Sequence, residues 1–140
     1  MHRRSLTLIV ACLAAPALVL TSAAIAADPP GKVTPAFSEA IANIPGKSLI
    51  AATVEYPPGG KSPPHHHAKS AFITGYVLSG AIRSQVDDGP VTIYRAGEHF
   101  TEAPGAHHRV SENASDTEPA KLLAIFVVDS TDNPLTVPDK

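Results

Sequence analysis

Apolar and polar positions alternate along the middle of the chain in short segments, as they do in β-strands. The alternation is clearest in residues 81–86, with the sequence AIRSQV, and similar segments bounded by turn residues occupy 49–56, 71–78, 91–94, 108–112 and 121–128. A spacing of about ten residues per strand is typical of a sandwich or small barrel. The pattern predicts an all-β domain whose interior is faced by Ile82, Val86, Leu123, Ile125 and Val127 or their immediate neighbours.

The same pattern predicts where the domain begins and ends. Residues 49–128 are expected to form the barrel, residues 27–48 an N-terminal lead-in and residues 129–140 a C-terminal tail. Within the lead-in, Phe37, Ile41 and Ile44 would share one helical face, but Pro45-Gly46 would stop such a helix after about two turns. No internal repeat and no second domain is indicated.

The first 26 residues have the composition of a secretory signal peptide. Arg3 and Arg4 form a basic head, residues 6–20 are almost wholly apolar, and Ala24-Ile25-Ala26 fits the small-residue cleavage pattern. Cleavage is therefore expected before Ala27. The protein is expected in the periplasm or outside the cell.

Two other interpretations of this N-terminus fit the sequence less well. A membrane anchor would need about 20 apolar residues, and the run of residues 6–20, interrupted by Pro16, is shorter. Cys12 loosely matches a lipidation site, but the apolar run continues well beyond it, which an acylated N-terminus would not require. Cleavage is the favoured interpretation of the three.

Composition after cleavage narrows the function classes. The remaining 114 residues suit one domain, and the only cysteine, Cys12, is lost, so no disulfide can form and stability must come from packing or a metal. Loss of Arg3 and Arg4 leaves nine basic residues against thirteen acidic ones, a net charge of −4. With no basic stretch left, nucleic acids and anionic membranes are not expected partners.

Two groups of histidines are the candidate metal ligands. His65, His66 and His67 follow Pro63-Pro64, and His107-His108 follows the turn Pro104-Gly105. On an extended segment residues i and i+2 point the same way, so His65 and His67 can reach one point while His66 points elsewhere. A third imidazole from a distant segment would complete a ligand set that suits Fe, Zn, Ni or Cu.

These segments resemble the two motifs of the cupin superfamily, and small single-domain bacterial cupins in particular. Residues 59–80, with the HHH run and the closing Gly80, are similar to the first motif, and residues 97–113 to the second. The resemblance implies a small jelly-roll barrel with one divalent metal ion inside (Fe, Zn, Ni, Cu or Mn). It implies His65, His67 and His108 as ligands, with His107 as the substitute for His108. Because small cupins often pair, a homodimer is possible.

The chain departs from the family pattern at the fourth ligand. The glutamate of the first motif has no match, because its place falls on Ile73. Glu102, six residues before His108, could supply the missing carboxylate, although an exposed strand residue is the favoured interpretation of it. Three imidazoles alone would leave open positions on the ion for an anionic ligand. An inward Glu102 would favour tighter metal binding instead.

Three functions fit this site. The first is a metal-dependent enzyme, as in related dioxygenases, acting on a small anionic or partly apolar molecule in the barrel. The second is a module that binds a metal or small ligand without turnover. The third is a metal-free barrel with remnant histidines. No general base is identifiable by spacing and fold does not dictate function, so the sequence names no reaction.

Overall fold

The computed structural model describes residues 28–140, and the predicted signal peptide of residues 1–26, with its cleavage site, lies outside them. The described part is built from strands and contains no helix, which confirms the all-β prediction. It therefore contains no helix long and apolar enough to cross a membrane. The strands are β1 (Lys32–Ala40), β2 (Lys47–Tyr56), β3 (Lys61–Ser62), β4 (His65–His67), β5 (Phe72–Ser79), β6 (Ala81–Val86), β7 (Thr92–Arg95), β8 (His99–Glu102), β9 (His107–Asn113), β10 (Ala120–Asp129) and β11 (Thr136–Pro138).

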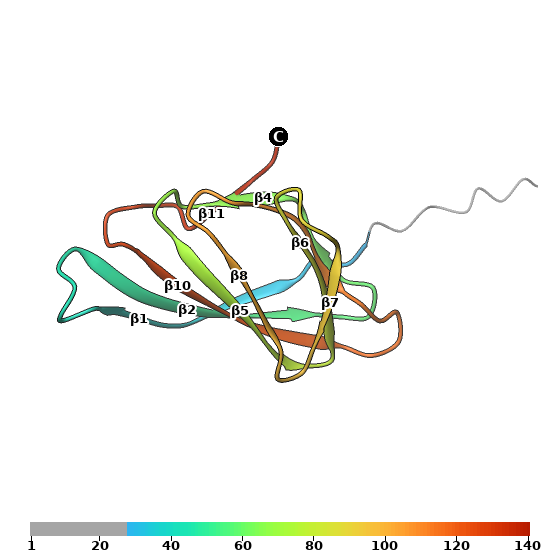
Figure 1. Cartoon of the computed structure of the whole chain (residues 1–140). Helices are drawn as coiled ribbons and strands as arrows, with labels where there is room; N and C mark the ends of the chain where they lie inside the picture. The colour runs from blue at the N-terminus through green and yellow to red at the C-terminus, as the bar shows by residue number, and fades with distance from the viewer. Residues whose placement is uncertain (1–27) are drawn as a thin grey trace, which may run out of the picture.

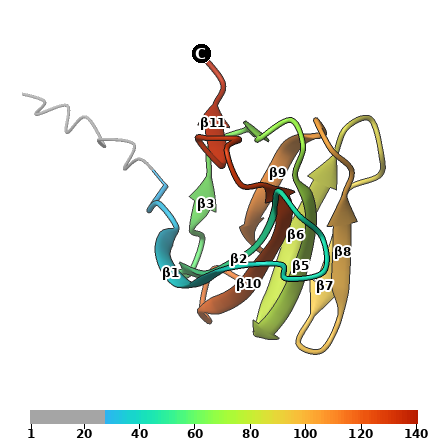
Figure 2. The ribbon, with the colours of Figure 1, turned by 90° about the vertical axis from the view of Figure 1, so that its left-hand side faces the viewer.

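The strands form two antiparallel sheets that enclose the core (Figures 1 and 2). One sheet has the order β1-β2-β10-β5-β8, and the other runs β11-β4-β9-β6-β7, with β3 also paired to β9. The β5–β6 hairpin turns at Gly80, whose φ of 68° favours glycine. A Cβ atom there would lie 2.6 Å from the Pro119 carbonyl oxygen. This close contact holds the turn against the start of β10.

Strand alternation determines which side chains form the core, and in β10 the buried positions are the immediate neighbours that the prediction included. Ile82 is fully buried as expected, and Val86 packs against the same cluster. In β10 the inward side chains are Leu122, Phe126 and Val128, the immediate neighbours of those predicted. A continuously apolar strand has no polar face to mark its phase, so only pairing with β2 and β5 decides it.

The expected lead-in forms part of the sheet. Instead of a short helix, residues 32–40 make strand β1, which pairs with β2 over most of its length. A bulge between Pro35 and Phe37 shifts the register, which brings Phe37 opposite Ala51. The helical spacing of Phe37, Ile41 and Ile44 was therefore misleading, because sheet pairing with β2 outweighs a weak local pattern.

The expected tail also returns to the barrel. Residues 136–138 form β11, which lies beside β4 (Figure 1). The two strands pair so that Thr136 lies opposite His67 and Val137 opposite His66. Leu135, just before β11, packs against the core cluster that contains Phe126 and Val128. This segment therefore forms part of the wall beside the histidines.

Candidate metal centre

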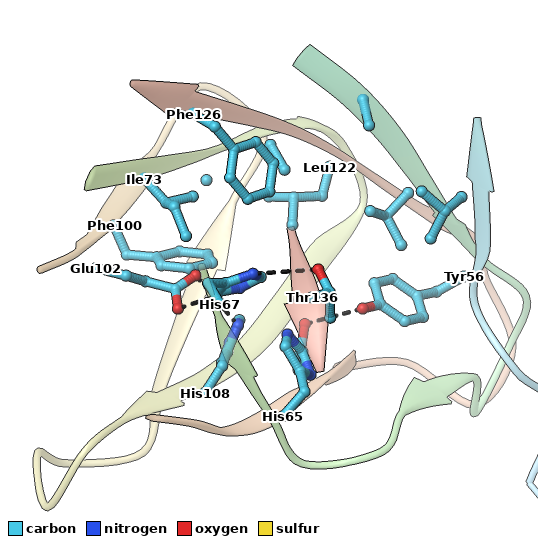
Figure 3. Close-up of a pocket in the computed structure, with 16 residues that line it drawn as sticks. Tyr56, His65, His67, Ile73, Phe100, Glu102, His108, Leu122, Phe126 and Thr136 are labelled. Atoms are coloured by element: carbon cyan, nitrogen blue, oxygen red, sulfur yellow. Dashed lines mark hydrogen bonds and ion pairs between the residues drawn. The ribbon is translucent and has the colours of Figure 1, made fainter. Parts of the chain in front are cut away.

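The histidines of the two sequence groups meet because β4 and β9 are neighbouring strands. His65 lies directly opposite His108, and His66 opposite His107. Since side chains alternate along a strand, His65, His67 and His108 all point into the barrel (Figure 3). His66 and His107 occupy the opposite face of the same two strands.

The inward histidines are close enough to share one ion. One potential ligand atom from each of His65, His67 and His108 lies within 4.8 Å of the others. Their ring centroids are 4.7 Å (His65–His67) and 5.1 Å (His65–His108) apart. The structure thus brings together the three histidines of the sequence prediction and separates His107 from them. That they bind an ion stays a prediction.

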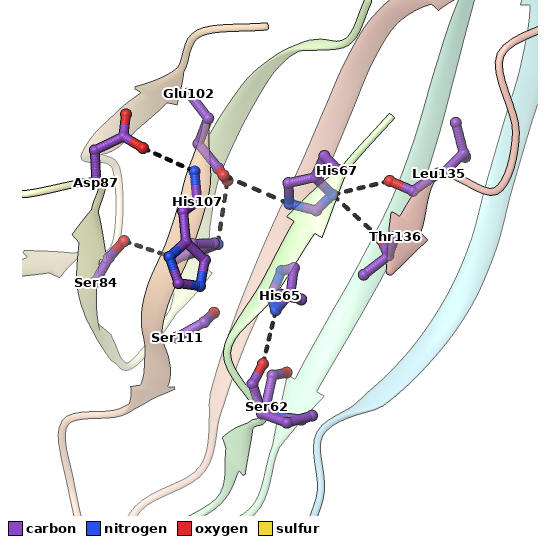
Figure 4. A network of polar contacts seen from close by, with 12 residues as sticks. Ser62, His65, His67, Ser84, Asp87, Glu102, His107, Ser111, Leu135 and Thr136 are labelled. Carbon is purple, nitrogen blue, oxygen red and sulfur yellow. Dashed lines mark hydrogen bonds and ion pairs between the residues drawn. The ribbon is translucent and has the colours of Figure 1, made fainter. Parts of the chain in front are cut away.

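Each inward ring is oriented by a hydrogen bond at one of its nitrogens. His65 Nδ1 lies 2.8 Å from the Pro63 carbonyl oxygen, and His67 Nδ1 lies 3.0 Å from the Leu135 carbonyl oxygen (Figure 4). Carbonyl oxygens only accept hydrogen bonds, so both Nδ1 atoms carry the proton. When these rings are neutral, their Nε2 atoms therefore have a free lone pair. Such outer bonds are the usual support of metal-ligating histidines.

The His108 ring is oriented by a hydrogen bond at Nε2, not at Nδ1 as in His65 and His67. Its Nε2 lies 2.9 Å from the hydroxyl of buried Ser84, which leaves Nδ1 facing Glu102. A hydroxyl can donate or accept, so Ser84 suits either tautomer of His108. When Ser84 accepts from Nε2–H, the Nδ1 lone pair is free to bind a cation.

Glu102 is buried beside these rings, which corrects the interpretation of it as an exposed strand residue. Its side chain is 3% exposed, its Oε1 lies 3.2 Å from His108 Nδ1, and its Oε2 lies 3.5 Å from His67 Nε2. In the sheet, Glu102 of β8 is directly opposite Ile73 of β5. The carboxylate that the family pattern expects at position 73 is therefore present one strand away, at the same level of the barrel.

The protonation states favour ligation at neutral pH. Burial raises the pKa of the Glu102 carboxyl, but the facing rings of His108 and His67 outweigh burial and lower this pKa to about 2. Burial lowers the pKa of His65 to about 4, with only partial opposition from the Pro63 carbonyl. At pH 7 Glu102 is therefore charged and His65 is neutral, the forms in which both groups bind metals.

The donor set fits a divalent metal ion. Glu102 Oε2 is buried and has no hydrogen-bond partner among the described residues, and His67 Nε2 lies 3.5 Å from it. A buried charged oxygen without a donor is costly, and a cation between it and the ring nitrogens would remove that cost. His65, His67, His108 and Glu102 could therefore hold one ion through three nitrogens and one carboxylate.

The space beside these residues is a small cavity with apolar walls. Its volume is about 100 Å³, and the described residues that line it include no lysine or arginine. Exposed Val33 and Thr136 lie at its edge, so the cavity opens between β1 and β11. Its apolar walls are formed by Ala52, Val54, Ile73, Phe100, Leu122, Ala124 and Phe126.

Gly75 leaves room for the Phe100 ring, which forms one of these apolar walls. It lies opposite Phe100, and a Cβ atom on it would come within 2.5 Å of the Phe100 ring. The ring can therefore lie over β5 and contact His108 edge-on, with centroids 5.6 Å apart. Glycine inside a strand is a sequence signal of close approach, and this one was missed.

The other residues that orient the histidines differ in how readily the sequence could have identified them. Ser84 shares the inward face of β6 with Ile82 and Val86, so alternation could have identified it. The Leu135 carbonyl and the Thr136 hydroxyl, 3.2 Å from His67 Nδ1, come from a segment with no strand-like pattern. Only the folded chain shows that they contact the site.

The chain is similar in sequence or structure to several known proteins. The chain is 33% identical over 106 residues to germin-like protein 5-1 of Oryza sativa subsp. japonica, covering 70% of this chain but 44% of that protein. It is similar in structure to a double-stranded β-helix protein from Klebsiella pneumoniae (TM-score 0.61, 18% identity, 82% of this chain and 90% of that one). It is also similar to an oxalate oxidase (TM-score 0.58, 28% identity, 77% and 54%).

A family model settles the classification. The model of the cupin domain matches residues 52–126, which run from the middle of β2 to the middle of β10. This range contains all four residues of the candidate metal centre. With two antiparallel sheets and a histidine cluster inside them, the chain belongs to the cupin family.

Proposed function

We propose that the protein holds one divalent transition metal ion (Fe, Zn, Ni, Cu or Mn) on His65, His67, His108 and Glu102, and binds a small monoanionic carboxylate beside it. The observation that carries the proposal is the buried Oε2 of Glu102, which has no hydrogen-bond partner in the described part of the chain and lies among the nitrogens of the inward histidines. The metal would supply positive charge and open coordination positions in a cavity whose described lining contains no lysine or arginine.

The net charge of the metal with its protein ligands determines which anions the site favours. Three neutral imidazoles and one carboxylate leave a divalent ion with a net charge of about +1, and no lysine or arginine lines the described cavity. A monoanion would neutralise that charge, whereas a dianion would leave a buried excess negative charge. Glu102 therefore favours a hydroxy acid monoanion over a dicarboxylate dianion.

Size and polarity narrow the ligand further. A cavity of about 100 Å³ has room for a molecule of about five non-hydrogen atoms, given that an apolar cavity of about 150 Å³ holds benzene. Its walls are apolar except near the rings and the Tyr56 and Ser111 hydroxyls, which bond each other at 2.8 Å. A two- or three-carbon hydroxy acid fits this description. Glycolate has been captured in an oxalate oxidase that is 25% identical to this chain.

A second function is oxidation of such a ligand, which the similarity to oxalate oxidase favours. A hydroxy acid would lose two electrons and two protons to become an oxo acid, and dioxygen would take them up. Glu102 is the only carboxylate in the described cavity wall, so it would also be the nearest proton acceptor. Oxygen consumption separates this function from binding alone.

One experiment tests the function. The purified chain from residue 27, analysed for metals, should contain about one transition metal ion per chain after dialysis against metal-free buffer. Isothermal titration with glycolate should show binding to this form and none to the chelated form, and oxalate should bind more weakly than glycolate. Oxygen uptake on addition of glycolate would identify an oxidase. Equal glycolate binding with and without metal would contradict the proposal.

We also propose that the protein is exported. The basic head, the apolar run and Ala24-Ile25-Ala26 support this, and a chain whose only cysteine leaves with the signal peptide suits an oxidising compartment. N-terminal sequencing of the protein made in a bacterial host should begin within a residue or two of Ala27, in the periplasmic or culture fraction. An intact Met1, or acylation at Cys12, would contradict it.

A further inference from the structure

A second pair of histidines lies back to back with the first. His66 on β4 and His107 on β9 are directly opposite each other on the outer face of the strands whose inner face carries His65 and His108. Their rings stack, with centroids 4.2 Å apart and an angle of 15° between planes. Parallel rings on adjacent strands can present their nitrogens to the same point outside the barrel.

A carboxylate from a third segment faces this pair. Asp139 directly follows β11, and its backbone N–H donates to the Pro64 carbonyl oxygen at 3.0 Å, which holds it beside β4. Its Oδ2 lies 2.8 Å from His107 Nε2, and its Oδ1 lies 3.9 Å from His66 Nε2. One potential ligand atom from each of the three residues lies within 4.8 Å of the others.

We propose that His66, His107 and Asp139 form a second, outer binding site for a divalent transition metal ion. Two imidazoles and a carboxylate are ligands that suit Zn²⁺, Cu²⁺ and Ni²⁺. Bonds of about 2.0–2.1 Å around one tetrahedral ion would separate the ligand atoms by roughly 3.3 Å, so shifts of about an ångström suffice. The side chains of His66 and Asp139 are 52% and 36% exposed, so an ion and its water ligands can reach them.

The alternative for these residues is an ordinary ion pair between His107 and Asp139. Such a pair does not explain the position of the His66 ring. The hydrogen bond between His107 and Asp139 accounts for one ring only. At 3.9 Å, His66 Nε2 is too far from Asp139 for a hydrogen bond, yet its ring stays stacked on His107. An ion would engage both rings and both strands at once.

This outer ion would also stabilise the wall of the inner cavity. Asp139 directly follows β11, and His67 is oriented at the other end of this strand by the Leu135 carbonyl and by the hydroxyl of Thr136, the first residue of β11. Thr136 lies at the edge of the cavity. Tying Asp139 to β4 and β9 through a metal would therefore hold β11 closed beside the inner site.

Zinc titration of the mature chain tests the outer site. In the parent, equilibrium dialysis at micromolar free zinc should find two ions per chain. His66→Gln and Asp139→Asn should each lose one, and the control His99→Gln, an exposed histidine on β8, should lose none. Glu102→Gln should keep the outer ion, so failure of the inner site and failure of the outer site are distinguishable.

Two further readouts do not depend on counting ions. With Cu²⁺ alone as the probe, electron paramagnetic resonance of a variant without the inner imidazoles (His65→Gln, His67→Gln and His108→Gln) should show coupling to two imidazole nitrogens at the outer site, and His66→Gln in that background should reduce this to one. Zinc should slow amide hydrogen exchange in residues 136–139 of the parent but not of Asp139→Asn. If both outer variants bind as much zinc as the parent, or zinc leaves exchange unchanged, the contact is an ion pair and the proposal is overturned.

Discussion

Replacing Glu102 by isoleucine should weaken divalent metal binding in the inner cavity by at least about 100-fold, and adding Ile73→Glu to that variant should restore most of it. The estimate follows from losses of about 10–100-fold when even a supporting outer residue is removed. The double variant moves the carboxylate to the directly opposite position on β5, with Cβ atoms about 5 Å apart. Chelator competition against the purified proteins measures the affinity.

Controls separate charge from packing in this exchange. Glu102→Gln keeps the shape and loses the charge, so it should behave like Glu102→Ile, whereas Glu39→Gln on exposed β1 should bind as the parent does. Ile73→Glu alone places two carboxylates on one ion, which should abolish glycolate binding because the net charge falls to zero. If the double variant binds no better than Glu102→Ile, the carboxylate cannot act from β5.

Replacing His108 by alanine should remove the metal that survives dialysis and lower the melting temperature of the metal-loaded protein by about 10 °C. An ion present at 100 times its dissociation constant stabilises the fold by about 2.7 kcal/mol. In a domain of this size each kcal/mol corresponds to about 4 °C. Elemental analysis and thermal unfolding, each with and without chelator, measure the two effects.

His107→Ala is the matched control for this experiment, because it removes the neighbouring histidine on the outer face of the same strand. It should keep the tightly held ion and most of the metal-dependent stabilisation. The chelated forms of parent and His108→Ala should differ less in melting temperature than the loaded forms do. Retained metal in His108→Ala together with lost metal in His107→Ala would reverse the assignment of the two residues.

Much of the fold was determined by local sequence pattern. Apolar alternation and turn residues predicted six of the seven strands of four or more residues between residues 47 and 129 to within a few positions, since these features act over neighbouring residues, but they missed β8. The same holds for His65 and His67, whose common direction follows from strand geometry. Where local pattern was weak, as in residues 32–40 and 136–138, the strands exist only because a partner strand is available.

The tertiary structure alone decided the fourth member of the candidate site. Nothing local distinguishes Glu102 from an exposed strand residue, because its burial depends on β8 pairing with β5 so that it lies opposite Ile73. The choice of His108 over His107 likewise depends on the phase of β9 against β4. Which face of a strand is buried is set by contacts between segments far apart in sequence, and those contacts exist only in the folded barrel.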